Sequence, residues 1–274
     1  MCPFGRRWVN GDGSLFETGT LCAHCLLIET EEGLILVDAG LSTLDLAQPK
    51  ERLSGPFRWL ARPRLDLERT ALHQIRSLGL NPDDVRHIII THGDLDHAGG
   101  LADFPNAAVH VYRDEYEAIQ NPDRLERTRY ESVLKLPQTP DWRVHEVDGE
   151  RWMGFDAVRP IPGVGPDVLM VPLFGHTRGH AGVAVAAEHG WWLHAGDAFF
   201  HGDQMLQDPS IPPGLGVFQK LVDHNRPQRV RNQARLRELA LAPSQDSVEV
   251  RVFCAHDPKA LASAQAAAAD QARA

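Results

Sequence analysis

The pattern of hydrophobic and polar positions in the first third of the chain predicts a β-hairpin and, after an interval, a buried strand. Two apolar runs, residues 21–30 and 34–37, are separated by Glu31-Glu32-Gly33, a polar break that is typical of a hairpin turn. Residues 85–90 are rich in β-branched side chains, which favours a buried strand. The residues that follow this strand are strongly polar, so its end is a candidate for a functional site.

The rest of the pattern mixes strands and helices without regular alternation. Further strands are expected at residues 108–112, 143–147, 168–171, 182–186, 191–193 and 248–254. Helices are expected at residues 65–78, 114–120 and 226–240, and from Pro258 onward. Hairpins with inserted helices indicate an α+β arrangement rather than a doubly wound sheet, in which strands and helices alternate.

Three segments are predicted to be loops. Residues 49–63 are rich in Pro and Arg, and residues 121–140 form a long polar connection that we expect to cap the active site. Residues 204–219 are a second candidate active-site loop. We expect residues 1–274 to form a single domain, because a chain that is 43% hydrophobic can bury a large core. Residues 262–274 are expected to end it as a fraying helix or tail.

Charge and composition narrow the classes of partner. The chain has 28 basic and 37 acidic residues, a net charge of −9, and such a surface repels nucleic acid. No apolar stretch approaches the roughly 20 residues that span a bilayer, and none resembles a secretory leader. We therefore expect a cytoplasmic protein with a small-molecule substrate and without a nucleic-acid or membrane partner. The oligomeric state is left open.

The four cysteines are too few and too scattered to predict a disulfide framework. Cys22 and Cys25 have C-x-x-C spacing, which is found in zinc and redox sites. The segment continues into an apolar run, and there is no second cysteine pair to close a tetrahedral zinc site. We therefore interpret these residues as part of a strand.

Four potential metal ligands lie within six residues after the strand at residues 85–90. They are His92, Asp94, Asp96 and His97. Imidazole and carboxylate groups are ligands that zinc, iron and manganese accept. This density on one turn predicts a metal site.

The same residues resemble the H-x-H-x-D-H motif of the metallo-β-lactamase superfamily. Four other elements of that family are present, and all five occur in the family's order along the chain. The other four are Val37-Asp38-Ala39-Gly40, Gly175-His176-Thr177-Arg178-Gly179-His180, Ala195-Gly196-Asp197 and Cys254-Ala255-His256-Asp257. Together they cover nearly the whole chain. The resemblance implies a four-layer αββα sandwich of two mixed β-sheets flanked by helices.

The resemblance also implies a role for each matched residue. His92, Asp94 and His176 would bind a first metal ion, Asp96, His97 and His256 a second, and Asp197 would bridge them. Asp38 would orient the ligand loop, and His180 would form a hydrogen bond nearby. Asp96 and Asp197 are the expected catalytic residues, with Asp96 as ligand and proton carrier. We expect two divalent ions, zinc first, with iron or manganese as alternatives.

One position departs from the family's motif. Asp94 stands where the family has its middle histidine, and a carboxylate makes the first site harder, which favours iron or manganese. The short Asp94 side chain could also fail to coordinate and leave only the second site fully occupied. The number of ions therefore stays open.

The expected chemistry is hydrolysis of an ester, thioester or lactone by a metal-activated hydroxide. The sequence contains no G-x-S-x-G elbow, the motif that would indicate a serine nucleophile. Phe200 stands where similar acyl-homoserine lactonases have a tyrosine. We interpret Phe199, Phe200 and Trp152 as core aromatics, with an apolar wall for an acyl chain as the alternative.

Two other functions are kept as alternatives: an iron-dependent oxidoreductase of the flavodiiron or sulfur-dioxygenase kind, and a non-catalytic metal-binding protein. The arginines of the helix at 226–240 are interpreted as a solvated face rather than a glutathione-binding patch; they are Arg226, Arg229, Arg231, Arg235 and Arg237. The remaining histidines are interpreted as surface or core residues, and His201, four residues after Asp197, is the one kept as a candidate neighbour of the site.

Overall fold

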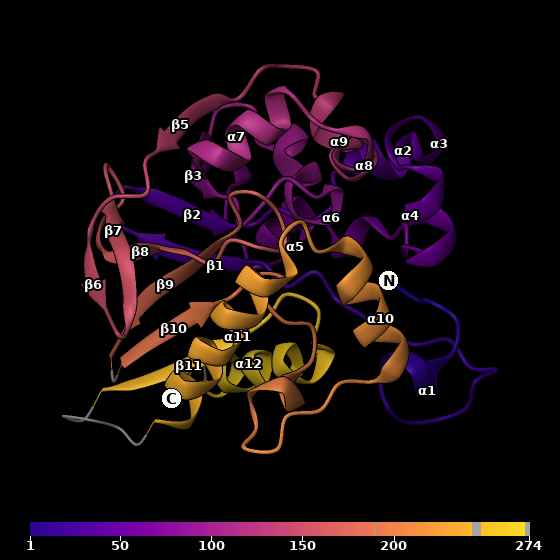
Figure 1. The fold of residues 1–274 in the computed structure, drawn as a ribbon. Helices are drawn as coiled ribbons and strands as arrows, with labels where there is room; N and C mark the ends of the chain where they lie inside the picture. The colour runs from indigo at the N-terminus through magenta and orange to yellow at the C-terminus, as the bar shows by residue number, and fades with distance from the viewer. Residues whose placement is uncertain (189, 243–247, 272–274) are drawn as a thin grey trace.

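Two β-sheets form the centre of the computed structural model, and helices cover their outer faces (Figure 1). The structure describes residues 1–188, 190–242 and 248–271. Apolar side chains of both sheets meet in the middle layer, among them Ile35 and Ile89 from one sheet and Met170 and Val183 from the other. Each is nearly inaccessible to solvent, and burying such a side chain contributes about 1.5–3 kcal/mol. The predicted αββα sandwich is confirmed.

The first sheet has the order β1-β2-β3-β4-β5. Its strands are β1 (Leu26–Thr30), β2 (Gly33–Val37), β3 (Val85–Ile89), β4 (Ala108–Tyr112) and β5 (Asp141–His145). β1 and β2 form the predicted antiparallel hairpin, and β2 to β5 are parallel. Parallel neighbours end at the same edge of a sheet. The turns after β2 and β3 therefore lie side by side.

The second sheet has the order β11-β10-β9-β8-β7-β6. Its strands are β6 (Glu150–Trp152), β7 (Phe155–Ile161), β8 (Gly165–Pro172), β9 (Ala181–Ala187), β10 (Gly190–His194) and β11 (Glu249–Phe253). The strands expected from residue 168 onward are confirmed. β6 and β7 were not predicted, because their residues include charged side chains and a proline and form no apolar run.

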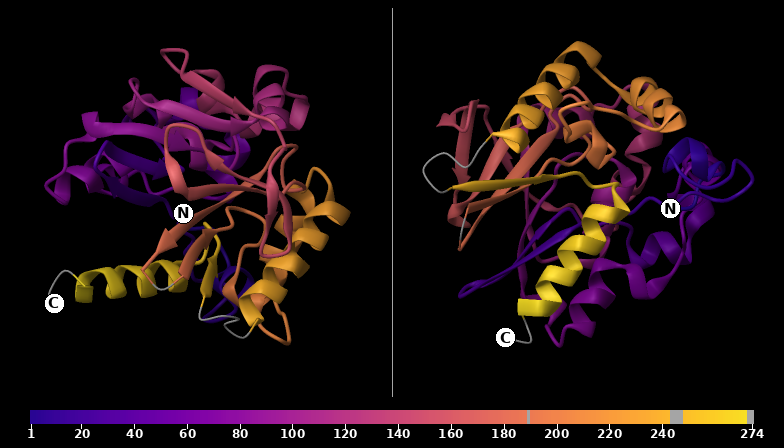
Figure 2. Two further views of the ribbon diagram at one scale, coloured as in Figure 1. Left: turned by 90° about the vertical axis from the view of Figure 1, so that its left-hand side faces the viewer. Right: turned by 90° about the horizontal axis from the view of Figure 1, so that it is seen from below.

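The helices surround this core, with α11 and α12 on opposite sides of β11 (Figure 2). They are α1 (Arg6–Val9), α2 (Thr43–Ala47), α3 (Pro49–Arg52), α4 (Gly55–Leu60), α5 (Ala71–Ser77), α6 (Leu95–Ala98), α7 (Arg113–Gln120), α8 (Arg124–Arg129), α9 (Glu131–Leu134), α10 (Pro213–Val222), α11 (Arg226–Leu241) and α12 (Pro258–Gln271). Short 3-10 turns are η1 (Leu67–Arg69), η2 (Pro82–Asp84), η3 (Gly99–Asp103) and η4 (Gly202–Met205). Within the described residues, no helix combines the length and apolar character needed to cross a lipid bilayer.

The three predicted loops contain helices, and this part of the prediction is wrong. Residues 49–63 hold α3 and α4, residues 121–140 hold α8 and α9, and residues 204–219 hold part of η4 and most of α10. Local capping explains α8: the Asp123 side chain accepts from the backbone of Glu126, whose side chain accepts from the backbone of Asp123. The terminal segment is helical to Gln271, and residues 272–274 lie outside the described residues.

The helix expected at residues 65–78 is interrupted. η1 ends before Thr70, whose side chain accepts a hydrogen bond from the backbone of His73 and so begins α5. Threonine is a favoured N-cap residue, because its oxygen satisfies a backbone donor that has no partner in the helix.

Candidate metal centre

The structure brings all seven predicted ligand side chains to one place. They form two groups, in each of which the potential ligand atoms all lie within 4.8 Å of one another. The first group is His92, Asp94, His176 and Asp197, and the second is Asp96, His97 and His256. Asp197 lies between the groups, with Oδ2 3.4 Å from His176 Nε2 and Oδ1 3.4 Å from His97 Nε2.

Asp38 joins the turn after β2 to the turn after β3. Its carboxylate accepts hydrogen bonds from the backbone and hydroxyl of Thr91 at 2.7 and 2.8 Å, and from His97 Nδ1 at 2.8 Å. Although burial alone would raise the pKa of Asp38, the neighbouring His97 lowers it to about 2. An ionised Asp38 accepts the Nδ1 proton and leaves His97 Nε2 free to bind an ion.

Two other histidines are oriented in the same way. His92 Nδ1 lies 2.9 Å from the Thr91 hydroxyl oxygen, and His256 Nδ1 donates to the Cys22 carbonyl at 2.7 Å. Residues 21–25 precede β1 and are not in a strand, so the strand interpretation of Cys22 and Cys25 is wrong. Both cysteines are free thiols, and burial raises the pKa of Cys22 to about 12.

His180 holds the backbone of Asp197 through a hydrogen bond. Its Nε2 accepts from the backbone N–H of Asp197 at 2.9 Å, and its Nδ1 donates to Leu173 O at 3.1 Å. Gly196 has a φ of 52°, and a Cβ there would lie 2.6 Å from His180 Nε2. The glycine therefore permits the close approach that places Asp197.

The charges around the second group favour a cation. Burial alone would lower the pKa of His97, but Asp197, Asp38 and Asp96 raise it to about 10. Burial also opposes the shift at His256, yet Asp197 raises its pKa. The carboxylates thus stabilise positive charge at this point, as a bound metal ion would supply.

Unpaired polar atoms indicate that the residues fit a metal ion. His92 Nε2, His97 Nε2 and Asp197 Oδ1 are buried and have no hydrogen-bond partner among the described residues. Buried polar atoms are nearly always paired, so each such exception needs an explanation. Imidazole nitrogens and carboxylate oxygens are ligands of divalent ions such as zinc. Ligation of a divalent ion by the second group accounts for His97 Nε2 and for Asp197 Oδ1, which lies 3.4 Å from it.

Glu115 in α7 was not recognised from the sequence. Its carboxylate accepts from the backbone N–H of Gly93 at 2.7 Å and of Gly179 at 3.0 Å, and from the Tyr130 hydroxyl at 3.0 Å. It thereby joins the two loops that carry His92 and His176. A glutamate in a helix is usually exposed, so nothing in the local pattern distinguished it.

Arg129, at the end of α8, was also missed. Its guanidinium contacts both carboxylate oxygens of Asp94, from Nε to Oδ1 at 2.8 Å and from Nη2 to Oδ2 at 2.7 Å. Nη2 also lies 2.8 Å from His176 Nε2. The segment expected to cap the site, residues 121–140, thus contributes a side chain directly to the first ligand group.

The aromatic residues divide between the site and the core. The Phe200 ring is buried and packs against the rings of His176 and His256, with centroids 5.7 and 5.3 Å apart. Phe199 lies in the core of the second sheet, and Trp152 packs on that core. The core interpretation is confirmed for these two residues, whereas Phe200 lies beside two histidines that are potential metal ligands.

The arginines of α11 are not all solvated. Arg229 is buried and pairs with Asp223 at 2.6 Å, so the prediction is wrong for this residue. Arg235 lies over the Phe155 ring, 4.5 Å from its centroid, and Arg226 and Arg231 are exposed.

The histidines outside the motifs lie mainly in the core. His24, His110, His145 and His194 are buried. His201 is also buried and caps η4, where its ring accepts from the backbone of Asp203. His189 lies outside the described residues.

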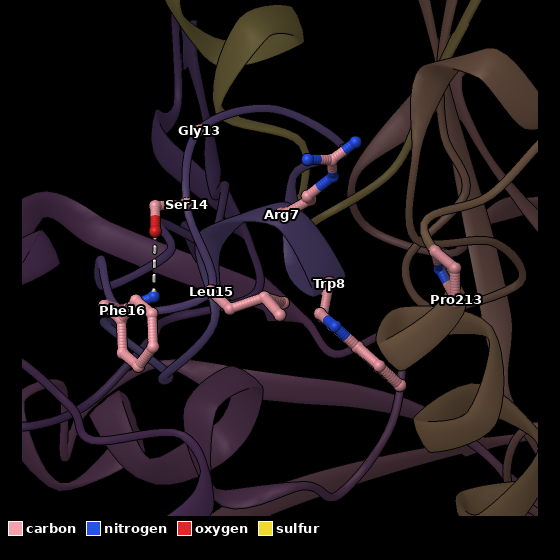
Figure 3. A pocket seen from close by; sticks show the side chains of 8 residues that line it. Arg7, Trp8, Gly13, Ser14, Leu15, Phe16 and Pro213 are labelled. Carbon is pink, nitrogen blue, oxygen red and sulfur yellow. Dashed lines mark hydrogen bonds between the residues drawn. The ribbon is translucent and has the colours of Figure 1, made fainter.

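A cavity of about 570 Å³ reaches the centre at Asp96. Leu21, Leu26, Leu41 and Leu261 contribute to its apolar walls, and Arg64 and Arg69 contribute basic groups. A second hollow, of about 700 Å³, lies between the N-terminal residues and the start of α10 and contains none of the ligand residues (Figure 3). The cavity at Asp96 is therefore the better candidate for a substrate site.

Comparison with known proteins agrees with this geometry. A family model described as the metallo-beta-lactamase superfamily matches residues 21–256. A probable metallo-hydrolase of Mycobacterium tuberculosis is 43% identical over 249 residues, 90% of this chain and 78% of the relative. The N-acyl homoserine lactonase AiiA of Bacillus thuringiensis subsp. kurstaki is 34% identical over 166 residues, 60% of this chain and 58% of the relative.

Solved structures show the same fold. One is an N-acyl homoserine lactone hydrolase with the product N-hexanoyl-L-homoserine bound at its catalytic metal center. It has a TM-score of 0.66 at 24% identity and covers 96% of this chain and 92% of that chain. Another is AidC, a dizinc quorum-quenching lactonase, with a TM-score of 0.57 at 17% identity and coverages of 94% and 84%.

Proposed function

The chain belongs to the metallo-β-lactamase superfamily, and we propose that it is a metal-dependent hydrolase that cleaves a lactone or a related ester or thioester. The observation that carries this proposal is the convergence of seven potential ligand side chains, three of which have a buried ligand atom without a hydrogen-bond partner among the described residues. The metallo-hydrolase and lactonase relatives support the same class of reaction.

We propose zinc as the ion of the second group, because two imidazoles and carboxylates are common ligands of catalytic zinc. When bound, such an ion lowers the pKa of water towards about 7 and polarises a carbonyl oxygen. Asp38 and the Cys22 carbonyl hold His97 and His256 so that each Nε2 faces the site. His180 holds the backbone of Asp197.

Asp96 and Asp197 are the proposed catalytic carboxylates. Asp96 is the ligand residue that lines the cavity, so its carboxylate can accept or return a proton of the substrate. Asp197 is buried between the two groups and places the negative charge of its carboxylate there. Phe200 has no hydroxyl to offer a substrate oxygen, which sets this chain apart from lactonases that use a tyrosine.

A lactone with an acyl chain is the first substrate to test. The leucine-lined part of the cavity next to Asp96 can hold an apolar chain, and Arg64 and Arg69 can hold a polar or anionic end. Thioesters with an anionic group fit the same features, so both belong in one panel.

The test combines metal analysis with turnover. The purified protein is expected to contain zinc and to hydrolyse at least one compound in a panel of lactones, nitrophenyl esters and thioesters. Asp197→Asn is expected to reduce turnover at least about 100-fold, the scale of losing one transition-state interaction. Asp208→Asn, at an exposed position, is the matched control and is expected to retain full activity.

Three results would point elsewhere. A folded, metal-loaded protein that is inert towards the whole panel would overturn the hydrolase proposal. Iron in the protein together with oxygen consumption on a persulfide would favour the iron-dependent oxidoreductase. A folded protein that takes up no divalent ion would favour a non-catalytic role.

A further inference from the structure

Arg129 contacts two of the four side chains of the first ligand group, Asp94 and His176. Its Nη2 is 2.7 Å from Asp94 Oδ2 and 2.8 Å from His176 Nε2. Those two atoms lie 3.4 Å from each other and are the atoms that the first group would offer to a metal. The guanidinium therefore bridges two of the four potential ligands.

The contact with His176 uses the electron pair that a metal ion would need. A guanidinium can only donate hydrogen bonds, so His176 Nε2 must be the acceptor in this pair. A ring nitrogen has a single electron pair in the plane of the ring. With Arg129 in place, His176 cannot bind an ion through Nε2.

The contact with Asp94 is a paired, charge-assisted one. Nε donates to Oδ1 and Nη2 to Oδ2, a bidentate geometry that is among the stronger hydrogen-bonding arrangements. The two side chains are only 11% and 15% exposed. The family's histidine at position 94 could not accept such a pair, so the aspartate and the arginine are chemically matched.

The surrounding structure holds Arg129 in this position. Its Nη1 donates to Val222 O at the end of α10 at 2.7 Å. One turn earlier in α8, both carboxylate oxygens of Glu126 accept from Arg178 at 2.7 Å, which binds α8 to the loop of His176. The adjacent Tyr130 is fully buried and donates to Glu115. The Arg129 side chain is thus held in place by a network of hydrogen bonds and ion pairs.

The second group is unaffected by this arrangement. Among the described residues, Asp96, His97 and His256 form no hydrogen bond or ion pair with Arg129, and His97 Nε2 is buried without a hydrogen-bond partner. Three protein ligands are the usual number at a catalytic zinc site. The first group without Asp94 and His176 is reduced to His92 and the shared Asp197.

We propose that Arg129 takes the place of the first metal ion, so that the centre binds one divalent ion in the second group and the guanidinium supplies the fixed positive charge beside it. This inference deepens the proposed function and rests on it only for the presence of the one ion. The sequence-based expectation of two ions stays the competing prediction, and the same measurement decides between them.

The experiment counts ions by a readout independent of activity. Metal-free wild-type protein is titrated with Co²⁺ while the visible absorption of the bound ion is followed, and the bound metal is confirmed by elemental analysis after gel filtration. We expect one tight equivalent per chain for the wild type. Arg129→Met, which keeps much of the length and removes the charge, is expected to bind a second equivalent at least about 100-fold more tightly than the wild type does.

Two further variants separate displacement of a metal from a structural effect. Asp94→His removes the partner of Arg129 and restores three histidines to the first group, so it is also expected to bind two ions. Arg127→Met, at an exposed position of the same helix, is the control and is expected to bind one. If Arg129→Met fails to fold, Asp94→His alone still tests the proposal.

The outcomes distinguish this inference from the proposed function. The proposed role of Arg129 would be overturned if the wild type bound two ions tightly. It would also be overturned if Arg129→Met and Asp94→His both folded and each bound a single ion. A wild type that binds one ion but hydrolyses nothing would leave Arg129 in its role and remove the hydrolase proposal. A wild type that binds no ion would remove both.

Discussion

The carboxylate of Asp38 holds the ring of His97 through Nδ1, with Oδ2 2.8 Å from that nitrogen, and leaves Nε2 as the potential ligand atom. Asp38 has a φ of 57°, a left-handed conformation that aspartate and asparagine tolerate better than most other residues. Because the contact fixes which nitrogen of His97 carries the proton, Asp38 controls the second ligand group without belonging to it.

The variant Asp38→Asn is expected to weaken metal binding about 10–100-fold. Asparagine fits the backbone, but its amide has one acceptor oxygen where the carboxylate satisfies Thr91 and His97 together. In the variant, a donor of Thr91 or His97 therefore faces the amide N–H₂ group and loses its hydrogen-bond acceptor. Competition with a chromophoric chelator measures the change in affinity.

Asp84→Asn, an exposed carboxylate just before β3, is the control and is expected to keep the wild-type affinity. Unchanged metal affinity in Asp38→Asn would show that His97 does not need this partner.

The variant Glu115→Gln is expected to lower the free energy of unfolding by about 1–3 kcal/mol, the cost of leaving a buried donor unpaired. The carboxylate receives three donors, from Gly93, Gly179 and Tyr130. A glutamine can accept through only one of its two terminal atoms, and its N–H₂ group faces donors. Urea denaturation of the metal-free protein measures the effect.

Asp114→Asn, at the preceding exposed position of α7, should leave the urea midpoint where it is in the wild type. If both variants unfold at the same urea concentration, Glu115 does not hold the two loops together.

Folding stability is expected to fall as the pH is lowered below about 6.5, in part through His110. This residue is buried between His87 and His145, with ring nitrogens 3.0 and 2.9 Å apart. Burial, assisted by the two neighbouring histidines, lowers the pKa of His110 to about 3. The folded pKa is below the unfolded value of about 6.5, so the unfolded state binds more protons in this interval and is favoured by acid.

The measurement is urea unfolding of metal-free wild type and His110→Gln between pH 7.5 and 5. Well below pH 6.5, the wild type should lose about 1.4 kcal/mol per pH unit more than the variant, the value for one proton. Parallel pH dependences would contradict the pKa direction for His110, whatever the absolute stability of the variant.

The sequence by itself was enough to identify the strands of the first sheet and the ligand motifs that follow strands in both sheets. Both signals are local. A β-branched run such as residues 85–89 predicts a buried strand, and His92, Asp94, Asp96 and His97 are adjacent to it in the chain. The resemblance to the superfamily then associated them with His176, Asp197 and His256, and the structure brings these residues together.

Only the tertiary structure decided how Asp94 is used. Arg129 follows it by 35 residues, in a segment whose polar, proline-punctuated pattern indicated a loop. Glu115 likewise serves loops 22 residues before it and 64 residues after it. A periodic pattern indicates which face of an element is apolar. These partners are instead set by how α7 and α8 contact the loops that follow β3 and β8. Ion pairs and hydrogen bonds between distant segments leave no local signature, and they determine which donors remain free for a metal.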